Sequence, residues 1–99
     1  MIEESTQHLS VLTAALHFPN AQSLKDKRMV LKSLKDRVRS QFNVSVAELD
    51  GQDKWQIATL AFAMIGNDGR RIDSCLSNII SFIDAFGGVE LCDCQIEKH

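Results

Sequence analysis

Five basic side chains recur at helical spacing within residues 23–41: Lys25, Arg28, Lys32, Lys35 and Arg39. Their separations alternate between three and four residues, and each residue of an α-helix turns by about 100°, so they all fall on one narrow arc. At about 1.5 Å of rise per residue, the row is about 21 Å long. Such a row suits the phosphates of a nucleic acid or an acidic protein surface. The alternative is a solvated helix face.

A polar cluster is the second candidate site. His17, Asn20, Asp50 and Asp53 lie in segments that we expect to meet at one end of a sheet. A histidine beside an aspartate can serve as a general acid–base pair. However, no nucleophile, metal-ligand set or cofactor motif accompanies them, and the loop FPNAQS has no glycine or arginine to hold a phosphate. We therefore expect no enzyme activity, no metal and no cofactor.

Lys27 and Glu48 are oddly placed for charged residues. Lys27 falls within the apolar stripe of helix 23–41, between Leu24 and Leu31, and Glu48 follows the parity of the apolar residues on its strand. We predict that the two side chains meet as a partly buried ion pair that fastens the helix to the strand. The alternative is that the Lys27 side chain extends to water.

Cysteine is the remaining residue type whose side chain could bind a metal or form a disulfide. Cys75, Cys92 and Cys94 make an odd number, which argues against a disulfide framework. Cys92 and Cys94 are expected on the same side of one strand, but structural zinc requires four ligands. We expect the Cys92 and Cys94 thiols to be buried as small apolar side chains.

The elements that position these residues follow from hydrophobic periodicity. Alternating or continuous apolar runs predict strands at 8–17, 43–50, 55–65 and 89–96, and apolar residues at helical spacing predict helices at 23–41 and 70–86. Ser23 with Asp26 forms a helix-capping pattern. The order βαββαβ predicts an α+β, ferredoxin-like fold, in which a four-stranded antiparallel sheet carries two helices on one face.

Strands 8–17 and 55–65 are apolar on both faces, which is typical of central strands. One face of such a sheet stays uncovered, and a homodimer through this open face would bury it. The alternative is that its alanines and threonines leave it only mildly apolar. The strands also lack the aromatic pair that an RNA-recognition motif uses to stack bases.

Length and composition limit the number of domains and the class of protein. The chain has 99 residues, of which 44% are hydrophobic and 24% are charged, and these values suit one globular domain. We expect a flexible lead-in at 1–7 and a single domain at 8–97. The net charge of −2 conceals a strong asymmetry, because residues 23–41 carry seven Lys/Arg against Asp26 and Asp36. The acidic N-terminus does not resemble a signal peptide and no apolar run suits a membrane, so a cytoplasmic protein is expected.

Several segments resemble the YlxP-like (DUF503) family of small bacterial proteins: LHFPNAQSLKDKRMVLKSLKDRV at 16–38, FNVSVAE at 42–48 and DKWQ at 53–56. The resemblance implies a ferredoxin-like fold and an uncharacterised function. Family genes often lie beside those for translation initiation factor 2 and ribosome-binding factor A, which implies by association a role near the ribosome. Asn20 stands where relatives tend to have glycine, and asparagine tolerates a left-handed backbone.

These observations predict a non-enzymatic domain that binds ribosomal RNA or a translation-associated protein through the basic helix 23–41. The alternative is a protein–protein adaptor or regulatory homodimer that binds an acidic partner and no nucleic acid.

Overall fold

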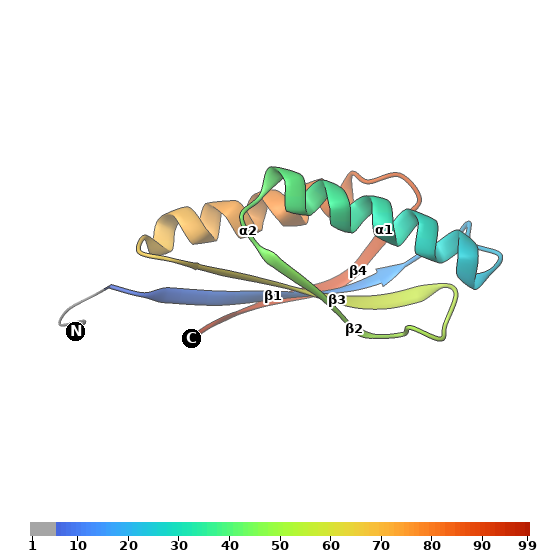
Figure 1. Cartoon of the computed structure of the whole chain (residues 1–99), viewed down its shortest axis with the longest axis horizontal. Helices are drawn as coiled ribbons and strands as arrows, with labels where there is room; N and C mark the ends of the chain where they lie inside the picture. Colours follow the sequence, from blue (N-terminus) through green and yellow to red (C-terminus); the bar gives the residue numbers. More distant parts are fainter. Residues whose placement is uncertain (1–5) are drawn as a thin grey trace.

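The computed structural model describes residues 6–99, and its elements follow the predicted order (Figure 1). They are β1 (His8–His17), α1 (Leu24–Gln41), β2 (Ser45–Asp50), β3 (Ile57–Gly66), α2 (Gly69–Asp84) and β4 (Glu90–Lys98). Residues 1–5 of the predicted lead-in lie outside the described residues. The ferredoxin-like α+β prediction is confirmed.

The four strands form one antiparallel sheet in the order β2-β3-β1-β4. Strands β1 and β3 are central, as their apolar character on both faces predicts. They pair along their whole length, from His8 opposite Gly66 to His17 opposite Ile57. Both helices lie on one side of this sheet, and the other side carries no helix (Figure 1).

The start of α1 is fixed by local hydrogen bonds. The Ser23 hydroxyl oxygen accepts from the Asp26 amide at 3.1 Å, and the Asp26 carboxylate accepts from the Gln22 amide at 3.0 Å. These bonds satisfy amide groups that a helix N-terminus otherwise leaves without partners. The predicted cap is thereby confirmed, and it sets the register in which the following side chains face the sheet or the solvent.

Helix α2 begins behind Asp68, whose carboxylate accepts from the amides of Arg70 and Arg71. It ends at Asp84, two residues before the predicted end at 86. Gly88 then adopts φ of +87°, a left-handed conformation in which any residue with a Cβ would be strained. The chain can therefore turn sharply into β4.

The core fills the space between the helices and one face of the sheet. Its members are apolar side chains from β1, β3, both helices and the connecting segments, and the largest include Leu12, Leu16, Phe18, Phe62, Leu34, Leu76 and Ile83. Burying one such side chain contributes about 1.5–3 kcal/mol relative to leaving it exposed. This packing fixes the face of α1 that turns away from the sheet.

Candidate nucleic-acid interface

The basic row of α1 borders a groove between this helix and the edge strand β2. The groove has a volume of about 410 Å³, and its lining residues are Arg28, Leu31, Lys32, Lys35, Asp36, Arg39 and Glu48. Leu31 is buried against the sheet and so fixes the rotation of the helix. Because the cations are three or four residues apart, this rotation brings four of the five predicted row residues to one groove, while Lys25 lies outside its lining.

Asp36 interrupts the row with a negative charge. Its carboxylate lies 2.6 Å from the Lys32 ammonium and 3.9 Å from the Arg39 guanidinium. Arg39 also donates to the Val46 carbonyl oxygen on β2 at 3.4 Å. The hydrogen bond from Lys32 lowers the pKa of Asp36, so the aspartate stays ionised at neutral pH. This pairing was not predicted, although the spacing of four residues between Lys32 and Asp36 signals it.

The other three cations of the row remain available. Within residues 6–99, the side chains of Lys25, Arg28 and Lys35 have no hydrogen-bond or ion-pair partner. Lys25 and Arg28 are exposed, and Lys35 is half-buried. The row therefore offers three free positive charges, rather than five, to an anionic ligand.

Lys27 points into the molecule from the buried face of α1. Its ammonium donates to the carbonyl oxygens of Gly51 at 2.5 Å, Lys54 at 2.5 Å and Ile57 at 3.0 Å. The Glu48 carboxylate is more distant, at 4.0 Å. The Lys27 side chain is only 1% exposed, so it does not reach water. Burial lowers its pKa, and the nearby Glu48 charge partly opposes this shift.

The structure thus brings Lys27 and Glu48 together, but the main contacts of Lys27 are the three carbonyl groups. These groups belong to the loop between β2 and β3 and to the first residue of β3. An ammonium has three N–H donors, and each finds one carbonyl oxygen. The sequence does not reveal these partners, because main-chain carbonyl groups leave no signal in the residue types.

The predicted polar cluster has a different organisation. The His17 Nδ1 lies 3.7 Å from the Glu90 carboxylate on β4. No hydrogen bond or ion pair joins it to Asn20, Asp50 or Asp53 among the residues that the structure describes. His17 pairs with Glu90 because the two residues are directly opposite in the β1–β4 register.

The expectation that the Cys92 and Cys94 thiols are buried is wrong for Cys92. The register between β1 and β4 shifts at Ala15/Leu16, where Ala15 is opposite Asp93 and Leu16 is opposite Leu91. Cys92 is therefore the extra residue of a β-bulge and is exposed, whereas Cys94 and Cys75 are half-buried. Residues 6–99 contain no group of three or more metal-ligating side chains.

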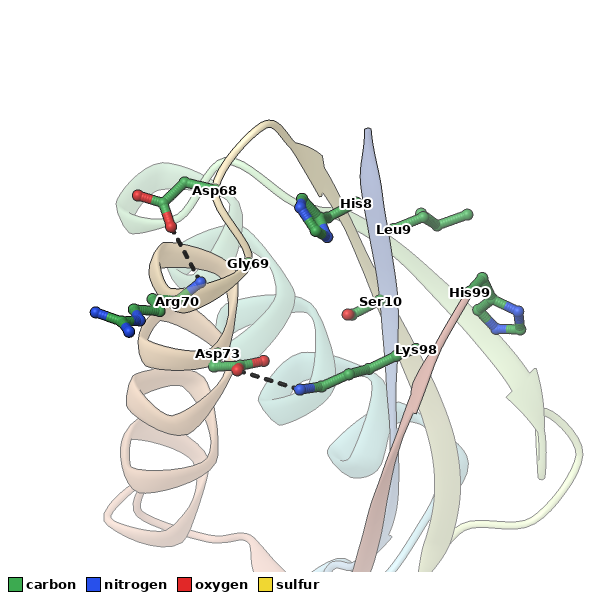
Figure 2. A pocket seen from close by; sticks show the side chains of 9 residues that line it. All are labelled: His8, Leu9, Ser10, Asp68, Gly69, Arg70, Asp73, Lys98 and His99. Atoms are coloured by element: carbon green, nitrogen blue, oxygen red, sulfur yellow. Dashed lines mark hydrogen bonds and ion pairs between the residues drawn. The ribbon is translucent and has the colours of Figure 1, made fainter. Parts of the chain in front are cut away.

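A second cavity, of about 470 Å³, lies at the end of the sheet opposite to His17, and no pattern in the sequence points to it (Figure 2). It is lined by the start of β1, the start of α2 and the end of β4. Two of its lining residues form an ion pair, in which the Lys98 ammonium lies 3.2 Å from the Asp73 carboxylate. His8 and Ser10 point into it from β1 (Figure 2). Because these residues come from distant segments, periodicity does not reveal their proximity.

Neither of the helices in the described part of the chain is long and apolar enough to cross a membrane.

Known proteins resemble this chain in both sequence and structure. The family model described as "Protein of unknown function (DUF503)" matches residues 9–96. The uncharacterized protein YlxP of Bacillus subtilis (strain 168) is 38% identical over 71 residues, which cover 72% of this chain and 77% of the relative. The family prediction is therefore confirmed.

Solved structures support the fold alone. The designed protein Foldit4 superimposes with a TM-score of 0.53 at 13% identity, over 93% of this chain and 96% of that protein. SnoaB, a cofactor-independent oxygenase from Streptomyces nogalater, reaches a TM-score of 0.48 at 11% identity, over 96% of this chain and 92% of that protein, and this likeness carries no functional argument. From the family match and the identity to YlxP, we conclude that the chain belongs to the DUF503 family of YlxP-like proteins.

Proposed function

We propose that this protein is a non-enzymatic domain that binds structured RNA through the basic row of α1 and the groove beside it. The observation that carries the proposal is the set of three cations on one arc of the helix that have no partner among the described residues, Lys25, Arg28 and Lys35. Phosphate groups are the anions that RNA presents at regular intervals along an accessible surface. The family resemblance implies work near the ribosome, so ribosomal RNA is the first ligand to test.

Structured RNA suits the molecule better than an unpaired strand does. Domains that read single-stranded RNA on a sheet stack its bases on two or three aromatic side chains. In the four described strands the one aromatic residue is Phe62, which is fully buried on the helix side. Contacts to phosphates by α1 require no base stacking, and they predict binding that depends little on RNA sequence.

The dependence of affinity on salt measures the number of phosphate contacts. Three contacts predict a slope of about −2.7 in a plot of log affinity against log salt concentration. Between about 50 and 200 mM salt, this slope corresponds to an affinity loss of about 40-fold. A slope near zero would contradict the proposal, because it would show that phosphate contacts contribute little to binding.

A charge-reversal pair locates the binding surface. Fluorescence anisotropy would follow a labelled ribosomal RNA hairpin with a stem of about 16 base pairs. We expect Arg28→Glu/Lys35→Glu to weaken binding at least tenfold. The matched control is Arg70→Glu/Arg71→Glu on α2, which changes the net charge equally at two exposed residues outside the groove. Equal losses in both variants would contradict a specific role for the groove.

The second class of ligand is an acidic protein surface, as an adaptor would bind. Polyglutamate tests it in the same assay, because it carries negative charge without phosphate. Binding of polyglutamate together with no binding of the RNA hairpin would overturn the RNA proposal in favour of the adaptor.

A further inference from the structure

The face of the sheet opposite the helices is accessible over both central strands. The register places alternate residues of β1 and β3 on this open face, from Leu9 opposite Ile65 to His17 opposite Ile57. Leu9 is 36%, Ile57 45% and Ile65 56% exposed, although all three are large apolar side chains. The open face therefore exposes apolar area at both ends of the central strands, and burying this area would be favourable.

The middle of the open face is formed by small side chains. Its residues on the central strands are Val11, Thr13, Ala15, Thr59, Ala61 and Ala63. A shallow depression of about 80 Å³ lies beside Thr13, Ala15 and Thr59 and reaches Asp93 on β4. Bulky residues at the ends and small residues between them make a surface on which an elongated apolar element can lie along the strands.

The open face carries acidic residues along its β4 edge. Ala15 is opposite Asp93 and Val11 is opposite Glu97, so both carboxylates project from β4 on the same side as the small residues. The four described strands contain one lysine and no arginine. This lysine, Lys98, pairs with Asp73 of α2 on the helix side. The negative charges of this face are therefore not balanced by a neighbouring cation of the sheet.

We propose that the open face binds a basic amphipathic helix of another protein. The apolar stripe of this helix would lie over the small residues of β1 and β3, and its basic flank would face Asp93 and Glu97. A helix of about 18 residues is about 27 Å long, which matches a ten-residue strand of about 33 Å. The partner thus differs in charge from the RNA that we assign to α1, and the two surfaces lie on opposite sides of the molecule.

A second copy of the chain fits this face less well. A twofold axis perpendicular to the strands would place β4 over β4 and bring like charges together, which is unfavourable. An axis parallel to the strands would place β4 over β2, whose open-face residues Ser45, Ala47 and the acidic Asp50 include no cation. The carboxylates of Asp93 and Glu97 would then lose water without gaining a partner. A basic partner supplies the missing charge.

The test uses a synthetic peptide of about 18 leucine and lysine residues with a helical apolar stripe. Amide chemical shifts of the whole protein would map its binding site. We expect shifts at Thr13, Ala15, Thr59 and Ala61, and a loss of affinity of at least tenfold in Asp93→Lys/Glu97→Lys. The matched control is Asp53→Lys/Asp84→Lys, which reverses two exposed carboxylates elsewhere.

Three outcomes would overturn the proposal. The first is an equal loss of affinity in both double variants, because general electrostatic attraction would then explain binding. The second is a set of chemical-shift changes confined to the helices. The third is a dimer in light scattering that Ala61→Glu dissociates, because a second copy would then cover the face. Circular dichroism would verify that each variant is folded, and the exposed Asp93 and Glu97 test the proposal even if Ala61→Glu does not fold.

Discussion

Lys32 donates a 2.6 Å hydrogen bond to Asp36, one turn further along α1. This contact neutralises part of the basic row, and Arg39 lies within 3.9 Å of the same carboxylate. Removing the charge of Asp36 should therefore strengthen the binding of RNA. Water weakens the repulsion between Asp36 and a nearby phosphate, so the gain in affinity should be modest.

The Asp36→Asn variant tests this prediction, because it keeps the shape of the side chain and removes its charge. We expect an affinity for the RNA hairpin about fivefold higher than in the wild type and a steeper dependence on salt. Asp84→Asn is the matched control, since Asp84 is exposed at the end of α2. Unchanged affinity in Asp36→Asn would show that phosphates do not reach this part of the groove.

Replacing Lys27 should destabilise the fold. Lys27→Met keeps an unbranched side chain but leaves three carbonyl groups without their shared donor. Losing a hydrogen bond to a charged group costs about 1.5–3 kcal/mol. Two effects reduce the total, because water can reach the freed carbonyl groups of the loop and the variant has no buried ammonium to desolvate. We expect the free energy of unfolding in urea to fall by about 2–4 kcal/mol. The exposed Lys25→Met is the control, and equal stability of the two variants would contradict this role.

The pH dependence of stability follows from the lowered pKa of Lys27. The unfolded chain keeps this proton up to about the ordinary pKa of 10.5, whereas burial makes the folded chain release it at lower pH. Between the two pKa values the unfolded state binds more protons, so the free energy of unfolding rises with pH. The stability difference between wild type and Lys27→Met should therefore increase as the pH approaches 10.5 from below.

Urea unfolding of both proteins, at pH 7 and at several values up to about 10, would measure this difference. A difference that shrinks over the same range would show that the three carbonyl dipoles outweigh desolvation and hold the proton on Lys27.

The three cysteines should react with a thiol reagent at different rates. Cys92 is exposed in the β-bulge, whereas Cys75 is half-buried in α2. Burial also raises the pKa of Cys75, which lowers its thiolate fraction at neutral pH. In the native protein, the Cys92 thiol should react with an aromatic disulfide reagent well before the Cys75 thiol does. The Cys92→Ser substitution should abolish this fast phase. A fast phase that persists in Cys92→Ser would contradict the assignment.

Local patterns were sufficient to predict the fold. Ser23 with Asp26 marks the start of α1, and the dense apolarity of β1 and β3 identifies the central strands. These features depend on neighbours within a few residues or on the alternation along one strand. The predicted ends of the strands were less accurate. For example, β3 starts at Ile57 rather than at residue 55, because hydrogen bonding to the rest of the molecule decides where pairing begins.

By itself, the sequence determined the order of the elements, their amphipathic faces and the alignment of the five cations on α1, because each of these follows from a repeat within one segment. Only the tertiary structure decided what surrounds these residues. It placed Lys27 against carbonyl groups 24 to 30 residues away and turned Cys92 outward at a bulge. It also brought Asp93 and Glu97 to the open face. Such contacts depend on strand register and on main-chain groups, which every residue shares and no residue type reveals.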